Sequence, residues 1–385
     1  MLKDCKLFKD TAPLEWWLDK VKLTEYEKMT LDNDVKTMRK MNGDINDFSF
    51  KLDNEGTEED YCWQREQLFS KLLNSNINPK DFELLMHKRA TIHIKELFDR
   101  YVDDDTLVII SDFNHISVEN PISKCKNVIR LDRECEDNNQ KHDVLLMLAT
   151  AKTFKKVFVY VIGTEFECGR RHSNIFYKEL HDRLNDMNIP TVMVLDAVQE
   201  MFLFPRDYSF YNFIIGTVHS LYYLFDTGLL FINKNLVPKE DIKYFTGYKR
   251  VDILKNINFG LDTILKRKDY ILMYRDIIND SIDWDLFRNY NLHNSQSNFF
   301  SIYAPEKFLY NNKCLDFINE KFIEHSKGSD PGVNVEISYH KPEKELFIRV
   351  RAQTMMFDKR DIESKFNYFY DNYMRLKLLE KTLTG

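Results

Sequence analysis

Glycine and proline are scarce in this chain of 385 residues, with 11 and 9 copies, and its six cysteines form no CxxC pair. Scattered single cysteines argue against both a disulfide framework and a zinc site. No apolar run reaches the length of a membrane-spanning helix, and the first residues lack the apolar core of a signal peptide. We therefore expect a cytoplasmic protein that makes no contact with membranes.

Charge of one sign is not concentrated anywhere in the chain. The 55 basic and 61 acidic residues are interspersed and give a net charge of -6, so nothing indicates nucleic-acid binding. Hydrophobic residues make up 43% of the chain and aromatic residues 14%, which is enough to build packed cores. The length exceeds what one core usually supports, so we expect two or three domains.

The hydrophobic pattern divides the chain into three parts. Residues 1–100 carry apolar residues at steps of three and four, and they predict a helical N-terminal domain. Residues 101–236 contain short, uniformly apolar runs separated by helical patterns, which is typical of a parallel sheet covered by helices. Residues 237–385 predict further helices and a β-hairpin. The expected fold is α/β, with a Rossmann-like, mostly parallel sheet between the helical domain and a C-terminal α+β extension.

The clearest unit is the segment from Val159 to Val198, which has the pattern of a strand, a glycine turn, a helix and a second strand. Near the C-terminus, alternation over residues 333–339 and again over "ELFIRVRA" predicts an antiparallel hairpin. A stripe of apolar residues from Ile362 to Leu383 predicts a final helix that packs on this hairpin or on a partner subunit.

A phosphate site is the strongest ligand hypothesis, at the turn that opens the helix after the strand ending near Ile162. Gly169 allows close approach of the backbone, Arg170 and Arg171 supply two cations, and Ser173 can donate a hydrogen bond or cap the helix. One glycine is not a GxGxxG motif, so a solvated basic turn or a protein contact is the alternative.

Asp196 ends the next apolar run, where it can bind a ligand hydroxyl, act as an acid or base, or simply cap the following turn. Cys168 precedes the basic turn, but no base is spaced to activate it, and we assign no catalytic residue. His115, together with Asp112 and Asn114, follows the first apolar run of the sheet, and His219 follows "FIIGT". No spacing of acidic residues supports a metal site, and we predict neither a metal nor a cofactor.

The order of motifs resembles the regulatory alpha, beta and delta subunits of eukaryotic translation initiation factor 2B, a family shared with ribose-1,5-bisphosphate and methylthioribose-1-phosphate isomerases. The resemblance rests on Glu165, Gly169 with Arg170, "NIPTVMVLDAV" with Asp196, "FIIGT" and Gly228 before "LLFINK". It covers roughly residues 75–235. The cysteine-containing "CNTG" signature of the methylthioribose-1-phosphate isomerases is absent, so isomerase catalysis is not expected.

This resemblance implies a non-catalytic regulatory or scaffold subunit of a guanine nucleotide exchange complex in translation initiation. Its expected partners are sister exchange-factor subunits and translation initiation factor 2, within an oligomer that contacts no nucleic acid. Two alternatives stay open. One is an isomerase-like enzyme that binds a sugar phosphate at Gly169, Arg170, Arg171, Ser173 and Asp196, and the other is an interaction protein built on a Rossmann-like platform.

Overall fold

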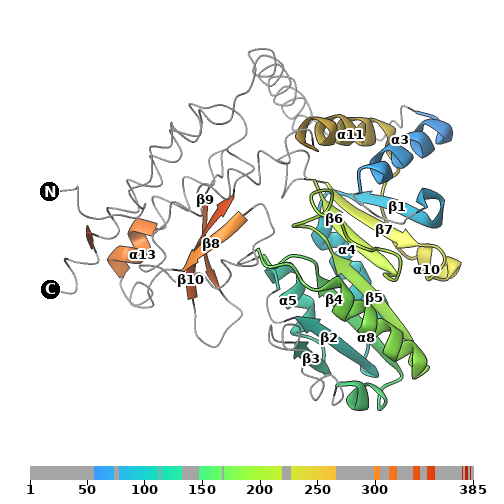
Figure 1. Ribbon diagram of the computed structural model, residues 1–385, viewed down its shortest axis with the longest axis horizontal. Coiled ribbons are helices and arrows are strands. Elements are labelled where there is room, and N and C mark those ends of the chain that lie inside the picture. Colours follow the sequence, from blue (N-terminus) through green and yellow to red (C-terminus); the bar gives the residue numbers. More distant parts are fainter. Residues whose placement is uncertain are drawn as a thin grey trace. The chain divides into compact units, whose positions relative to one another are not determined.

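The computed structural model describes residues 56–72, 78–111, 114–131, 147–166, 169–218, 227–265, 299–303, 312–318, 333–338 and 345–351, with residues 375, 378, 379 and 382 (Figure 1). The chain forms two compact units. One consists of Asn42–Phe166 and Arg171–Leu265, and the other of Met1–Met41, Glu167–Arg170 and Lys266–Gly385. The boundaries predicted at residues 100 and 236 stay predictions.

A seven-stranded sheet forms the centre of the first unit, in the order β1-β7-β6-β5-β4-β2-β3 (Figure 1). Its strands are β1 (Phe82–His87), β2 (Thr106–Ser111), β3 (Val128–Leu131), β4 (Lys156–Ile162), β5 (Thr191–Asp196), β6 (Phe213–Thr217) and β7 (Gly228–Asn233). The strands from β3 across to β6 pair in parallel, whereas β7 is antiparallel to both β6 and β1. The predicted mostly parallel α/β sheet is therefore confirmed.

Continuous burial explains why these strands lack alternation in the sequence. Every residue of β2, β6 and β7 is buried, as expected for strands covered on both faces. The prediction of helix throughout the first 100 residues was wrong at Phe82–His87, which forms β1. This segment pairs with Gly228–Asn233, and a strand defined by a partner so distant in the chain gives no local signal.

Helices cover both faces of the sheet. They are α3 (Glu58–Ser70), α4 (Ala90–Tyr101), α5 (Ile116–Ile122), α8 (Asn174–Asp186), α10 (Lys239–Ile242) and α11 (Val251–Leu265), with a short 3-10 turn η1 (Pro79–Asp81). One core joins α4 and α5 to the sheet face that includes Phe158, Tyr160 and Val194. The crossovers β2–α5–β3 and β4–α8–β5 run in opposite directions, so right-handed connections place α8 on the other face.

The second unit contains a three-stranded sheet in the order β8-β10-β9, with strands β8 (Phe299–Tyr303), β9 (Val333–Ser338) and β10 (Glu345–Arg351). It also contains helix α13 (Asn312–Ile318). Antiparallel pairing of β9 with β10 confirms the predicted hairpin. The predicted final helix lies mostly outside the described residues. Within the described part of the chain, no helix is long and apolar enough to cross a membrane.

Candidate functional site

The carboxyl edge of the parallel strands is the candidate site. The chain leaves β2 toward β3 and leaves β4 toward β5, so the two connections diverge between β2 and β4. In open α/β sheets, ligands bind in the crevice that opens at such a switch point. His115 follows β2 and Phe166 follows β4, and their rings meet there edge to face with centroids 4.7 Å apart.

Asp196 is the last residue of β5, one strand away from β4. Its side chain accepts hydrogen bonds from the Tyr160 hydroxyl at 2.8 Å and from the backbone N–H of Val198 at 3.1 Å. The residue is only 8% exposed. Burial raises the pKa of Asp196 to about 6, against the two hydrogen bonds that favour its ionised form, and the nearby Glu200 charge adds to the rise.

Tyr160 is the fully buried donor to this carboxylate, and it lies on β4. Burial, then the charge of Asp196, raises the pKa of its phenol well above the ordinary value. The hydroxyl therefore keeps its proton and acts as a donor to Asp196. A carboxyl with a pKa near neutrality at a strand end is the kind of group that can take a proton from a ligand or give one to it.

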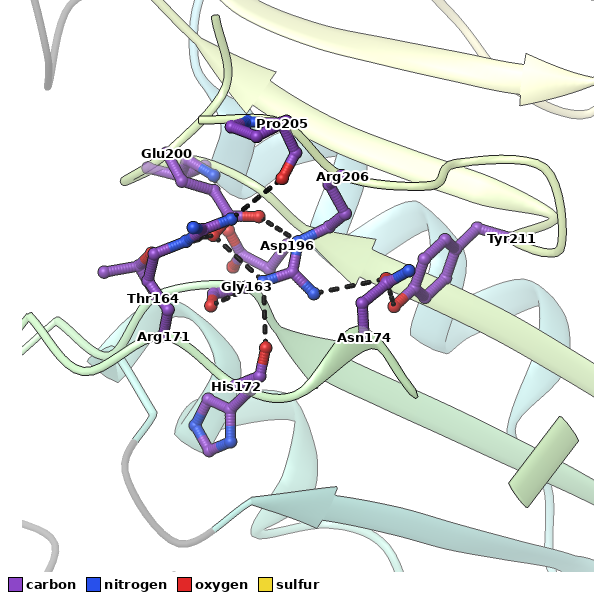
Figure 2. Close-up of polar contacts among 11 residues, drawn as sticks. Gly163, Thr164, Arg171, His172, Asn174, Asp196, Glu200, Pro205, Arg206 and Tyr211 are labelled. Atoms are coloured by element: carbon purple, nitrogen blue, oxygen red, sulfur yellow. Dashed lines mark hydrogen bonds and ion pairs between the residues drawn. The ribbon is translucent and has the colours of Figure 1, made fainter. Parts of the chain in front are cut away.

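Beside Asp196 lies a buried ion-pair network that the sequence analysis did not identify. Arg206 forms an ion pair with Glu200, and its guanidinium also donates to the carbonyl oxygens of Gly163 at 3.0 Å and His172 at 3.1 Å. Arg171 also donates to the Glu200 carboxylate, at 3.2 Å. Figure 2 shows how these side chains tie the turn after β4 to the segment between β5 and β6.

Glu200 is ionised in this network although it is completely buried. Burial alone would raise its pKa, but the Arg206 and Arg171 charges and the hydroxyl of Thr164, which donates at 2.9 Å, together lower it. The Glu200 carboxylate in turn raises the pKa of Arg206, against the effect of burial. In the sequence, Glu200 and Arg206 flank the apolar run "MFLF", but this spacing does not show that the two side chains pair.

Gly163 leaves the space that the Glu200 carboxylate fills. A Cβ atom at this position would lie 2.6 Å from the Glu200 carboxyl carbon. We expect Gly163→Ala to lower the free energy of unfolding by about 1 to 3 kcal/mol, because neither the carboxylate nor its arginines can move without losing contacts. Urea denaturation of the two proteins measures this difference, and equal midpoints would contradict it.

The structure gives most of the predicted site residues protein partners. Arg171 donates to Glu200 and to the carbonyl oxygen of Pro205, and its guanidinium lies over the Phe204 ring at 4.7 Å. The Ser173 hydroxyl caps α8 by accepting the N–H of Phe176 at 3.2 Å.

Gly169 has a φ of 75°, which glycine adopts without strain, and Arg170 is buried. Cys168, Asp112 and His219 lie outside the described residues. Among the described residues, no group of three His, Cys, Asp or Glu side chains is placed to hold a metal ion.

Comparison with known proteins gives structural similarity only. No family model and no curated protein sequence matches this chain. Solved structures with a similar fold include a NifS-like protein from Rickettsia africae, at a TM-score of 0.60 and 14% identity, covering 88% of this chain and 95% of that one.

Serine palmitoyltransferase from Sphingomonas wittichii follows at a TM-score of 0.59 and 12% identity, covering 91% and 86% of the two chains. SepCysS in its complex with the SepCysE N-terminal domain has a TM-score of 0.59 and 11% identity, covering 89% and 91%. At these identities the likeness establishes the fold and nothing more.

The predicted relation to translation initiation factor 2B was wrong. The structural neighbours are serine palmitoyltransferase, a NifS-like protein and SepCysS, and they give no support to an exchange-factor scaffold, a sugar-phosphate isomerase or partnership with initiation factor 2. The quoted motifs fall at strand ends and helix starts, where doubly wound sheets of many families need an acidic residue or a glycine. The motifs therefore indicate the α/β architecture and do not identify a family.

Several of the serine palmitoyltransferase structures contain pyridoxal phosphate, one of them as an internal aldimine. An internal aldimine requires a lysine amine. Between Phe213 and Asn233, from the start of β6 to the end of β7, the sequence has no lysine. At the carboxyl edge, Lys88 is the one described lysine that directly follows a strand. It is exposed and comes after β1, which lies at the border of the sheet.

Lys88 is three strands away from β5, roughly 14 Å at the usual strand spacing. The described residues therefore do not fit pyridoxal phosphate as a lysine-bound cofactor, although Asp196 offers a carboxylate of the kind that pairs with a pyridine nitrogen.

Proposed function

We propose that this chain is an enzyme that binds a small, flat ligand with a protonatable ring nitrogen at its carboxyl edge and exchanges a proton with it through Asp196. The observation that carries this proposal is the buried Asp196 carboxyl at the end of a central strand, with a pKa raised to about 6. Such a group is ionised at neutral pH, yet it accepts a proton far more readily than an ordinary aspartate.

The surroundings of Asp196 favour a ring over a flexible chain. His115 and Phe166 lie at the neighbouring switch point, and aromatic side chains supply broad apolar contact to a planar ligand. The presence of pyridoxal phosphate in serine palmitoyltransferase structures of the same fold supports a pyridine as the ring. A cytoplasmic location belongs to this proposal as well.

Each residue around the proposed ligand has a separate role. Asp196 holds or releases the proton, and Tyr160 and the Val198 N–H fix the carboxyl plane from inside the sheet. The Glu200–Arg206 pair holds the segment after β5 against the turn after β4, which keeps the two sides of the site at a constant separation. The anion site predicted at Gly169, Arg170, Arg171 and Ser173 stays a separate prediction.

Equilibrium dialysis at pH 7 with pyridoxine 5′-phosphate and pyridoxal 5′-phosphate tests the proposal. We expect Asp196→Asn to weaken binding at least about tenfold, because it removes a charge-assisted hydrogen bond to the ring nitrogen. Asp182→Asn is the matched control, since Asp182 is an exposed carboxylate on α8 whose partner is Lys178, and it should bind as the unmodified chain does.

The pH dependence gives a second test of the same group. Binding by the unmodified chain should weaken as the pH falls below about 6, where Asp196 takes up its proton. Failure of the unmodified chain to bind either compound, or equal binding by the Asp196→Asn variant, would contradict the proposed function.

A further inference from the structure

Among the described residues, no lysine directly follows β2, β4, β5 or β6 at the carboxyl edge, where a carbonyl compound beside Asp196 would lie. Lysines 124, 126, 152, 155 and 156 precede β3 or β4 and so lie at the opposite edge of the sheet. Lys178, on α8, is exposed and paired with Asp182. Lys234 follows β7, which runs antiparallel and ends at the opposite edge.

The strand pair nearest to Asp196 offers no alternative amine. Asp196 pairs with Ile215 of β6, and β6 pairs with β7 over Phe213–Thr217 and Gly228–Ile232. Neither strand nor their connection contains lysine. Formation of a Schiff base requires an amine nitrogen to attack the carbonyl carbon, with loss of water, and this stretch supplies no such nitrogen.

Among the described residues, the polar groups at this position suit a ring nitrogen rather than a carbonyl. Asp196 contributes a carboxylate, and its partners Tyr160 and Val198 are both donors already engaged with it. Such contacts are the same whether the ring carries an aldehyde, an amine or an alcohol. Contacts to the ring nitrogen and to the face of the ring do not discriminate among these substituents.

Resting on the proposed function, we infer that the ring ligand is a dissociable substrate rather than a resident cofactor, and that the chain binds its aldehyde, amine and alcohol forms about equally. The class of ligand is a substituted pyridine whose side group is an aldehyde, an amine or an alcohol. A protein that holds its cofactor through lysine would instead favour the aldehyde strongly, because only the aldehyde forms the covalent bond.

The test measures the dissociation constants of pyridoxal 5′-phosphate, pyridoxamine 5′-phosphate and pyridoxine 5′-phosphate by equilibrium dialysis with the full chain. We expect values within about threefold of one another and complete removal of the aldehyde by dialysis. Borohydride reduction of the aldehyde complex, followed by intact-mass measurement, should leave the mass of the protein unchanged at a stoichiometric ratio of ligand.

Each other outcome has a separate meaning. Aldehyde binding at least tenfold tighter than alcohol binding, together with a borohydride-stable adduct, would overturn this inference and leave the proposed function standing. Repeating the reduction with Lys88→Arg identifies an adduct on the amine at the outer strand. Absence of binding by all three compounds would overturn the proposed function and this inference together.

Discussion

Arg206→Met should lower the free energy of unfolding of the seven-stranded unit by about 3 to 5 kcal/mol. Glu200 is completely buried, and the substitution leaves its carboxylate without the guanidinium that pairs with it most closely. The change also removes the donors to the carbonyl oxygens of Gly163 and His172, which are then left without this partner in the interior. Hydrogen exchange of the β4 and β5 amides measures the effect, since these strands open only when the sheet unfolds.

A matched control separates burial from charge. Lys178→Met breaks an ion pair with Asp182 on the exposed side of α8, where both side chains are about half exposed. Because solvent screens this pair, its loss should cost less than about 1 kcal/mol. If the two variants lost similar stability, the Glu200–Arg206 pair would not be the buried link that the structure describes.

A double variant tests the origin of the cost. Arg206→Met combined with Glu200→Leu removes both charges and fills the space with apolar groups, so no uncompensated carboxylate remains. We expect the double variant to be more stable than Arg206→Met alone by at least about 1 kcal/mol, although Arg171 then loses one of its two acceptors and keeps the carbonyl oxygen of Pro205. Additive losses from the two changes would contradict the assigned coupling.

The strands that could be predicted from the sequence are those made almost entirely of apolar residues. β2, β4, β5 and β6 are apolar along almost their whole length, which a doubly covered parallel sheet requires. β1 could not be predicted in this way because Phe82–His87 continues a helical spacing and becomes a strand only through β7. Likewise, nothing in the residues of β7 distinguishes an antiparallel strand from a parallel one.

Residues of the candidate site could be predicted only where their position in the sequence shows that they lie at the end of a strand. Asp196 was identified because an acidic residue ending an apolar run marks a strand's carboxyl end. Tyr160 was missed because only the pairing of β4 with β5 brings its hydroxyl to Asp196. Glu200 was missed because its partners Arg171 and Arg206 come together only in the folded chain. The family was misassigned because short motifs at strand ends recur in unrelated doubly wound proteins.

Asp196 should make the seven-stranded unit less stable as the pH rises from about 4 to about 7. In the folded chain its pKa is raised from 3.8 to about 6, so the native state binds this proton more tightly than the unfolded state does. The stabilisation from this proton is complete below the unfolded pKa and is lost as the pH rises through about 6. The shift corresponds to about 3 kcal/mol.

Comparison of variants separates this contribution from the titration of groups that do not interact with Asp196. Asp196→Asn cannot ionise, so its free energy of unfolding relative to the unmodified chain should increase between pH 4 and pH 7, whereas Asp182→Asn should follow the unmodified chain. The Glu200 charge raises the pKa of Asp196, so the difference between the unmodified chain and Asp196→Asn includes this interaction. Urea denaturation at half-unit intervals of pH measures the differences, and parallel profiles for the unmodified chain and Asp196→Asn would contradict the assigned pKa.

Tyr160→Phe tests the physical origin of the shift. The Tyr160 hydroxyl lowers the pKa of Asp196 by donating to the ionised carboxylate, while burial acts in the opposite direction and is larger. Removing the donor without opening the core should raise the pKa of Asp196 further, so the loss of stability should continue to a pH above about 6. If the loss instead ended at a lower pH, water would have replaced the phenol and reduced the effect of burial. An ionised carboxylate that is buried at neutral pH makes the protein less stable than a neutral side chain would at the same position. Such a loss of stability is expected at a functional site, where the group must take up and release a proton.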